Sequence, residues 1–356
     1  MNAAFDKSKK VRPGEELDVA RLEAYLVSRL PAVSGPLVVE QFPSGFSNLT
    51  YMLRLGDQEF VLRRPPVGNV VKSAHDMGRE YRVLAKLCRV YPPAPEPLLM
   101  CEDEHIIGSQ FYIMQRLRGV ILRKSNTPSE LIATPGLVTT LCESFIDNFA
   151  RLHRIDYQAA GLGDLGRPTG YVERQVTGWV GRYAKAKTDE YAEMESLGDW
   201  LAENMPVDTP PALIHNDYKY DNLVLDPRDM SNIIGVLDWE MATIGNPLMD
   251  LGSTLAYWVE PDDPPAEHAR AFGPTMLPGS LTRGQLAQRY AQSADIELPD
   301  MSFYYAFGLF KLSVIVQQIY ARFAAGKTQD RRFAQLNAMV ETLGKAGLRV
   351  VETGKI

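Results

Sequence analysis

The chain has 356 residues, of which 45% are hydrophobic and 23% are charged, and this composition excludes a disordered, collagen-like or coiled-coil protein. Its length suggests two domains or one large unit with two lobes. Lys and Arg number 38 against 44 Asp and Glu, so the formal net charge is −6 and the overall basic charge of many nucleic-acid-binding proteins is absent. The three cysteines are widely spaced and predict neither a disulfide framework nor a zinc site.

The sequence also argues against a membrane protein. Residues 1–18 are polar and lack the apolar stretch of a signal peptide. The most apolar run, residues 304–319, is interrupted by Lys311 and two glutamines and is too short to span a bilayer. We therefore predict a soluble, cytoplasmic protein without a nucleic-acid or membrane partner; the sequence does not indicate an oligomeric state.

The first part of the chain, up to about Arg116, is predicted to form mainly strands. Short apolar runs are separated by turn residues such as Pro43-Ser44-Gly45 and Gly56-Asp57. The helices here are predicted from apolar residues at helical spacing, and prolines end the second one. The expected elements are a helix at 17–30, strands at 37–42, 49–55 and 59–63, a helix at 77–90, and a hairpin with strands at 105–107 and 111–115.

Helical patterns dominate after Leu117. Apolar residues recur at i, i+3, i+4 and i+7 from Val138 to Leu152, which is typical of a long amphipathic helix. We therefore predict an α+β fold with two lobes, a small antiparallel sheet lobe at 1–116 and a larger helical lobe at 117–356. Further helices are expected at 171–185, 190–204, 248–258, 283–293, 304–323 and 332–346, with a short β insert at 223–225 and 233–237.

One polar motif indicates the chemistry. His215, Asp217 and Asn222 have the spacing His-x-Asp-x4-Asn. An apolar strand follows Asn222, and a second apolar strand, after a short turn, ends at Asp238. Phosphoryl transfer needs a carboxylate that orients the attacking hydroxyl, and oxygen ligands that hold Mg²⁺ against the phosphates. Asp and Asn are also common in turns, so the pair Asp221-Asn222 alone would mean little. The coincidence of the spacing, both strands and the final acid favours the chemical interpretation.

At this point the sequence resembles the aminoglycoside phosphotransferase family, small-molecule kinases with a protein-kinase-like fold. It is most similar to the subgroup related to the kinase-like domain fused to acyl-CoA dehydrogenases. The similarity covers roughly residues 38 to 258. The stretches that carry it are Gly45–Tyr51, the strand Phe60–Arg63 with Arg64-Pro65-Pro66 after it, His215–Leu225, and Leu237–Leu251.

The resemblance implies a role for each residue of the motif. Asp217 would be the catalytic base, and Lys219 would reach the transferring phosphate. Asn222 and Asp238 would be the Mg²⁺ ligands. Asp250 would brace the catalytic loop. The implied cofactors are ATP, or GTP in its place, and Mg²⁺.

The resemblance also assigns the nucleotide phosphates to the first lobe. Gly45, Ser47 and Asn48 would form a loop over the phosphates, although the same residues suit an ordinary hairpin turn. Arg63 stands where related kinases have the lysine that grips the α and β phosphates. Arg64, on the opposite face of the strand, is the alternative.

Two further assignments rest mainly on the family. Glu80 would form an ion pair with Arg63, whereas a lone glutamate is by default a solvated surface residue. The backbone from Gln115 to Leu117 would hold the adenine edge, although a strand that only completes the sheet fits these residues equally well.

We therefore predict an ATP- or GTP-dependent, Mg²⁺-dependent O-phosphotransferase that acts on a small hydroxylated molecule. The alternative is a nucleotide-binding pseudokinase or scaffold without transferase activity. Arg63 in place of lysine favours this alternative, whereas the presence of Asp217, Asn222 and Asp238 opposes it. A protein kinase is disfavoured because Asp238-Trp239-Glu240 replaces the Asp-Phe-Gly segment. The subgroup is linked with hydroxy-acyl or other lipid-derived acceptors, and the acceptor itself is left open.

Overall fold

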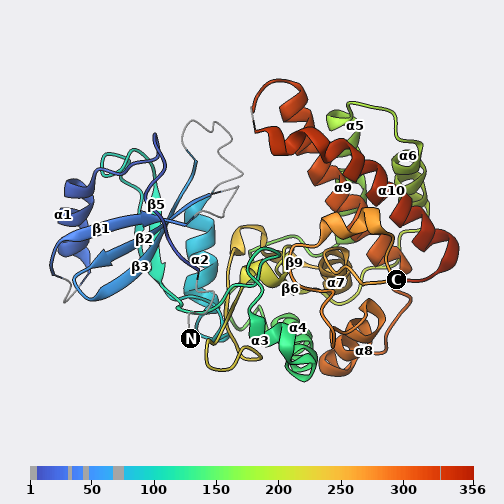
Figure 1. The fold of residues 1–356 in the computed structure, drawn as a ribbon, viewed down its shortest axis with the longest axis horizontal. Coiled ribbons are helices and arrows are strands. Elements are labelled where there is room, and N and C mark those ends of the chain that lie inside the picture. The colour runs from blue at the N-terminus through green and yellow to red at the C-terminus, as the bar shows by residue number, and fades with distance from the viewer. Residues whose placement is uncertain (1–5, 31–33, 43–47, 67–75, 329) are drawn as a thin grey trace. The chain divides into compact units, whose positions relative to one another are not determined.

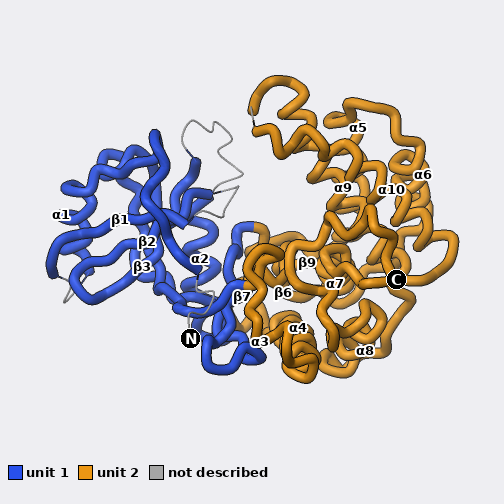
Figure 2. The backbone as a smooth tube through the Cα atoms, in the orientation of Figure 1, with its two compact units in different colours: residues 1–121, 223–240 blue, residues 122–222, 241–356 orange. Residues whose placement is uncertain are grey.

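The computed structural model describes residues 6–30, 34–42, 48–66, 76–328 and 330–356. The chain divides into two compact units (Figure 2). Unit 1 consists of residues 1–121 and 223–240, and unit 2 consists of residues 122–222 and 241–356. The predicted division of function, nucleotide binding in 1–116 and catalysis in 117–356, stays a prediction.

Unit 1 is built on a five-stranded antiparallel sheet (Figure 1). β2 and β3 are joined by the two-residue turn Gly56-Asp57, in which Gly56 adopts the positive φ of 60° that such tight hairpins require. The sheet order is β1-β2-β3-β5-β4, from β1 (Leu37–Gln41), β2 (Leu49–Leu55), β3 (Gln58–Arg64), β5 (Phe111–Gln115) and β4 (Pro97–Cys101).

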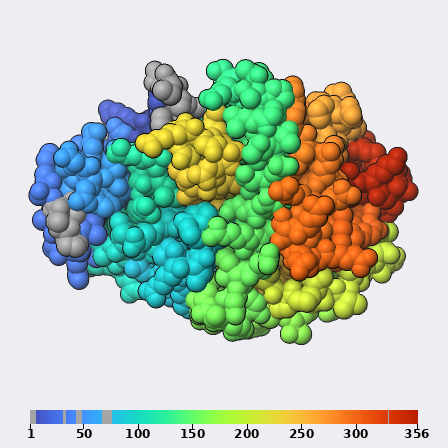
Figure 3. Space-filling view, turned by 90° about the horizontal axis from the view of Figure 1, so that it is seen from below, coloured from blue at the N-terminus to red at the C-terminus, as the bar shows by residue number. Residues whose placement is uncertain are grey.

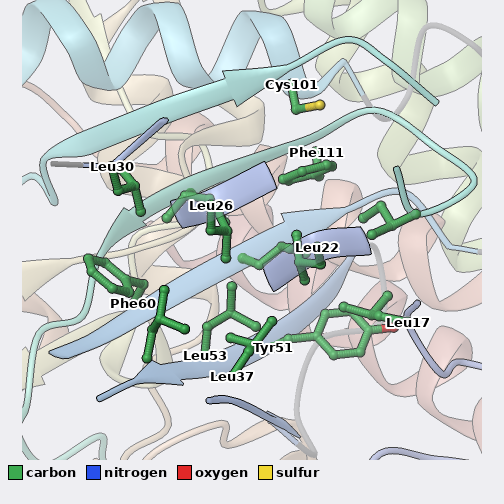
Figure 4. Close-up of a cluster of buried hydrophobic side chains, with 14 of the residues drawn as sticks. Leu17, Leu22, Leu26, Leu30, Leu37, Tyr51, Leu53, Phe60, Cys101 and Phe111 are labelled. Atoms are coloured by element: carbon green, nitrogen blue, oxygen red, sulfur yellow. The ribbon is translucent and has the colours of Figure 1, made fainter. Parts of the chain in front are cut away.

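Helix α1 (Val19–Arg29) covers one face of this sheet. Its buried Leu22 and Leu26 belong to one apolar cluster with side chains of β2, β3 and β5 (Figure 4). Alternate residues of β3, Phe60 and Leu62, join that cluster. Because successive side chains of a strand point to opposite faces, Arg63 lies on the other face.

The predicted strand at residues 105–107 is wrong. β5 pairs with β3 and with β4, which begins at Pro97, whereas residues 104–108 form a turn closed by a 2.7 Å hydrogen bond from the Gly108 N–H to the Glu104 carbonyl. From the sequence, the prolines at 92–97 indicate only the end of the preceding helix. β4 is an edge strand of the sheet, where a proline without an N–H is tolerated.

The hairpin β7 (Leu223–Leu225) and β8 (Ile233–Val236) belongs to unit 1 although it follows a long segment of unit 2. Val120 and Leu225 exchange two backbone hydrogen bonds of 2.9 and 2.8 Å. Gly119 makes this approach possible, because a Cβ there would collide with the Leu225 carbonyl. The chain thus returns to unit 1 immediately after Asn222.

Unit 2 is mainly helical, and α9 (Ser302–Ala324) is its central helix, buried on all sides over most of its length. α7 (Pro247–Ala256) crosses α9 where two glycines, Gly252 and Gly308, leave no room for a Cβ. The remaining helices are α3 (Ser129–Ala133), α4 (Pro135–His153), α5 (Tyr171–Ala186), α6 (Ala192–Glu203), α8 (Arg283–Ala294) and α10 (Leu336–Thr353).

The C-terminal part of α10, coloured red, lies on the surface of unit 2 in the space-filling view (Figure 3). A short strand pair, β6 (Ala212–Ile214) with β9 (Thr243–Gly245), precedes α7 in the chain and was not predicted, because three-residue strands carry too little pattern. In the described part of the chain, no helix has both the length and the hydropathy to cross a bilayer.

Candidate active site

The polar motif of unit 2 begins directly after β6, and a buried carboxylate holds it in place. Asp250, in the first turn of α7, accepts the backbone N–H of His215 (2.7 Å) and of Asn216 (2.8 Å). His153 lies 3.2 Å from the same carboxylate. Burial by itself would raise the pKa of Asp250, but the hydrogen bond and charge of His153 lower it below its ordinary value. Asp250 therefore braces the loop as an anion.

Asn216 has a left-handed backbone conformation (φ 68°), which is uncommon for a residue other than glycine. The buried ammonium of Lys311, from α9, donates to the Asn216 carbonyl at 3.0 Å. Burial lowers the pKa of Lys311. This turn of the backbone sets the direction in which the next residue, Asp217, presents its carboxylate.

Donors surround the Asp217 carboxylate. The Tyr257 hydroxyl donates to Oδ1 at 3.0 Å, and Lys219 Nζ lies 3.0 Å from Oδ2. Asn222 Nδ2 donates to Oδ2 at 2.9 Å and to the Asp217 backbone carbonyl at 2.8 Å. The structure thus brings Asp217, Lys219 and Asn222 together within unit 2, as the motif spacing predicted. Because both carboxylate oxygens have donors, the Asp217 carboxylate is held in one orientation.

The chemistry of Asn222 and Asp238 suits a hard divalent cation. Because the amide nitrogen of Asn222 is used on Asp217, the amide oxygen is its remaining ligand atom. Along the chain, Asn222 of unit 2 directly precedes β7, and Asp238 of unit 1 follows β8 by two residues. Amide and carboxylate oxygens, completed by phosphate and water, are typical Mg²⁺ ligands. No cluster of three or more His, Cys, Asp or Glu ligands occurs among the described residues.

A further carboxylate, Asp221, lies beside this group and titrates unusually. Its carboxylate is 3.9 Å from Lys219 Nζ. Burial raises the pKa of Asp221 from 3.8 to about 6, and the nearby charge of Lys219 only partly opposes that rise. The carboxyl group is therefore harder to ionise in the folded protein than in the unfolded chain.

We expect Asp221→Asn to stabilise the protein at neutral pH but not in acid. A raised folded-state pKa contributes stability below 3.8 that is lost as the pH rises through about 6. The asparagine variant lacks this loss, so its advantage in free energy of unfolding should grow across that window to at most about 3 kcal/mol. Denaturant unfolding across this pH range measures it, with the exposed Asp189→Asn as control. An advantage that does not change with pH would contradict the assignment.

Within unit 1, Arg63 is surrounded by acids. Its guanidinium lies 3.1 Å from Glu80 of α2 (Met77–Leu87), 2.8 Å from Asp238 and 3.6 Å from Glu240. Glu80 is 1% exposed, so the interpretation of a solvated surface glutamate is wrong. Burial raises the pKa of Glu80, and the Arg63 charge opposes that rise. Arg64 points to the α1 face, where it donates to the Ile107 carbonyl at 3.1 Å.

The predicted phosphate loop lies only partly within the described residues. Gly45 and Ser47 are outside them. Asn48, at the end of that stretch, is buried, and its Nδ2 donates to Glu240 at 2.6 Å. Asn48 thus contacts the same acid that flanks Arg63.

The segment predicted to hold adenine ends β5. The Gln115 backbone N–H donates to the Glu96 carbonyl at 2.8 Å, so an adenine contact by a backbone N–H would fall to the residues after it, Leu117 included. Met114 is buried and pairs with Val61 in the sheet. These facts fit a strand that completes the sheet, and the adenine role stays a prediction.

Sequence reasoning missed four residues that contact these groups. The sequence places Tyr257 and Lys311 in the expected helices 248–258 and 304–323, and Glu240 in the segment Asp238-Trp239-Glu240, and no pattern singles out Phe272. The only available signal was their chemistry, a lysine within the apolar run 304–319 being the clearest case.

With this geometry established, comparison with known proteins identifies the family. The model of a phosphotransferase enzyme family matches residues 38–284. The chain belongs to this phosphotransferase family. The predicted membership and the predicted kinase-like α+β fold are both confirmed.

Relatives of this phosphotransferase family member include acyl-CoA dehydrogenase family member 11 of Rattus norvegicus, 33% identical over 348 residues. The match covers 96% of this chain but only 44% of that relative's length. Among solved structures, a protein of Ralstonia eutropha JMP134, named by inference an aminoglycoside phosphotransferase, is 30% identical with a TM-score of 0.81 and coverages of 96% and 100%.

More distant structures share the fold alone. Choline kinase of Cryptosporidium parvum Iowa II is 13% identical with a TM-score of 0.65, and the match covers 95% of this chain and 97% of that one. A mutant of aminoglycoside phosphotransferase APH(4)-Ia, solved with ADP and hygromycin B, is 17% identical with a TM-score of 0.59 and coverages of 92% and 98%.

Proposed function

We propose that this chain is an ATP- and Mg²⁺-dependent O-phosphotransferase that acts on a small hydroxylated molecule. The observation that carries the proposal is the oriented carboxylate of Asp217, held by Tyr257, Lys219 and Asn222 on a loop braced by Asp250. A strained, braced loop that ends in an oriented carboxylate is typical of a catalytic group. A bound nucleotide is supported by the ADP complex of the similarly folded APH(4)-Ia.

In this proposal Asp217 accepts or orients the proton of the acceptor hydroxyl, and Lys219 meets the negative charge of the transferring phosphoryl group. Mg²⁺ would be held by Asn222 and Asp238 and would neutralise phosphate charge when bound. Arg63, oriented by Glu80, would contact the nucleotide phosphates as a planar fork. Gly45, Ser47 and Asn48 would cover those phosphates, and Gln115 to Leu117 would hold the base.

The charges of unit 2 favour an acceptor that is not a polycation. Lys219 lies against Asp217, and Lys311 supports the preceding residue. The acidic side chains of the segment 188–203, the kind that bind a polycation, are partly paired, since Lys187 binds Glu190 and Glu195, and Lys345 lies 3.8 Å from Glu193. A hydroxylated acceptor without several positive charges fits this surface better.

A second candidate is a nucleotide-binding protein without transferase activity. The observation that favours it is the 2.8 Å contact of Arg63 with Asp238, which places a cation on a proposed metal ligand. In this candidate the acids of unit 1 serve Arg63 rather than a metal ion.

A screen for acceptor-dependent ADP release separates the two candidates. The purified chain is incubated with ATP and Mg²⁺ and with hydroxylated metabolites, hydroxy acids and aminoglycosides, and ADP is measured with and without each acceptor. Release that depends on an acceptor, together with phosphate found on its hydroxyl, supports the transferase. Nucleotide binding without transfer to any compound supports the second candidate, and strong selective use of aminoglycosides would contradict the acceptor preference.

A further inference from the structure

The ammonium of Lys219 lies over two aromatic rings. Nζ is 4.9 Å from the ring centroid of Tyr257 and 4.9 Å from that of Phe272. The two rings meet edge to face, with centroids 5.1 Å apart and planes at 85°. A cation over an aromatic face is attracted by the negative charge of that face, more strongly when little water is present. The Lys219 side chain is only 15% exposed, so this attraction should be substantial.

Tyr257 contacts both members of the predicted catalytic pair. Its ring lies beneath Lys219, and its hydroxyl donates to Asp217 Oδ1 at 3.0 Å. Lysine has a flexible four-carbon stem and can adopt many rotamers in the absence of such contacts. The rings and the carboxylate together favour the position of Lys219 that the structure shows.

Two buried arginines fix Tyr257. Arg270 Nη1 donates to the Ala256 carbonyl at 2.6 Å, and Arg283 Nη1 donates to the Trp258 carbonyl at 3.0 Å, so the residues on both sides of Tyr257 are held. Asp263 joins the arginines, with a two-pronged contact of 2.7 Å to Arg283 and a 3.3 Å contact to Arg270. Burying such charges costs free energy unless their geometry is close to ideal. A buried ionic network therefore holds the backbone on both sides of Tyr257.

The same segment places Phe272. Phe272 follows Arg270 by two residues, and Gly273 packs on the Tyr220 ring so closely that a Cβ would lie 2.9 Å from it. Phe272 is nevertheless 40% exposed. A large apolar side chain held in place but left partly exposed contributes less to the core than to the lysine beside it.

We propose that Tyr257 and Phe272 are positioning residues that hold the Lys219 ammonium against Asp217, where it meets the transferring phosphoryl group. This inference rests on the proposed function, because it gives Lys219 a role in phosphoryl transfer. Neither residue belongs to the His-x-Asp-x4-Asn motif.

Exchanging Phe272 for residues of different character tests the inference. Phe272→Leu keeps an apolar side chain but removes the aromatic face, so kcat should fall about three- to thirty-fold while the KM for nucleotide stays unchanged. Phe272→Trp keeps the face and should retain most of the activity. Tyr257→Phe keeps its ring and loses its hydroxyl, which separates the contact with Lys219 from that with Asp217. Thermal unfolding of each variant controls for loss of structure.

A double-mutant cycle and a labelling experiment decide the outcome. In a Lys219→Met background, Phe272→Leu should have no further effect, because the ring acts through the lysine. The rate at which Lys219 reacts with an amine-acylating reagent, followed by mass spectrometry, should rise in Phe272→Leu and not in Phe272→Trp. Equal losses in the leucine and tryptophan variants, or unchanged labelling of Lys219, would overturn the inference. Because labelling does not need turnover, it gives a result even if the proposed function fails.

Discussion

Asp217→Asn is expected to lower the turnover of acceptor phosphorylation by about 10²- to 10⁴-fold, the usual contribution of a general base. Asparagine has the shape of aspartate and can still accept from Tyr257 or Lys219, so the loop should keep its conformation. It cannot take up the proton of an acceptor hydroxyl at neutral pH. Acceptor-dependent ADP release measures the loss, and calorimetry with nucleotide should show binding close to that of the unchanged protein.

The control for Asp217→Asn is Asp226→Asn, a carboxylate that follows β7 and caps a turn through the Arg228 amide at 2.8 Å. This variant should keep full activity. Retained phosphoryl transfer in Asp217→Asn would show that another group serves the hydroxyl. Loss of nucleotide binding together with a lower unfolding temperature would instead mean that Asp217 has a structural role.

Most of unit 1 could be predicted because its signals are local. The alternation of apolar residues and the turn Gly56-Asp57 gave β2 at its observed bounds and β3 to within one residue. β4 was missed because prolines dominate the sequence before it and disfavour a strand. It forms a strand because it pairs with β5 at the edge of the sheet, where a proline is tolerated. In the same way, residues 223–240 join unit 1 through the contact of Leu225 with Val120, more than a hundred residues away in the chain.

In the candidate site, too, residues that are close in the chain could be predicted, and residues that are distant in the chain could not. Asp217, Lys219 and Asn222 lie within six positions of the chain, so a motif could place them together. Tyr257 and Lys311 reach the loop from 40 and 95 residues away, and in sequence each resembles a residue of a buried helix. Only tertiary packing decides which polar group a buried tyrosine or lysine will meet, and a single sequence does not contain that information.

Arg63→Met is expected to lower the free energy of unfolding of the protein by about 3–5 kcal/mol, the usual cost of removing one partner of a buried ion pair. The substitution leaves Glu80, Asp238 and Glu240 close together without their shared cation. Burial already raises the pKa of Glu80, and loss of the guanidinium should raise it further. Glu80 then takes up a proton more readily as the pH falls, so the destabilisation should be largest at neutral pH and shrink in acid.

Arg64→Met is the matched control, because Arg64 is equally buried in the same strand but donates to the backbone carbonyls of Ile107 and Pro65. It should cost only about 1–3 kcal/mol, the price of unpaired carbonyl groups, and should leave nucleotide affinity intact, whereas Arg63→Met should weaken it. Adding Glu80→Met to Arg63→Met should restore part of the stability, since an apolar pair can replace a buried ion pair. Denaturant unfolding and nucleotide titration measure these effects. Equal losses of affinity in the Arg63 and Arg64 variants would contradict the assignment of the phosphate contact to Arg63.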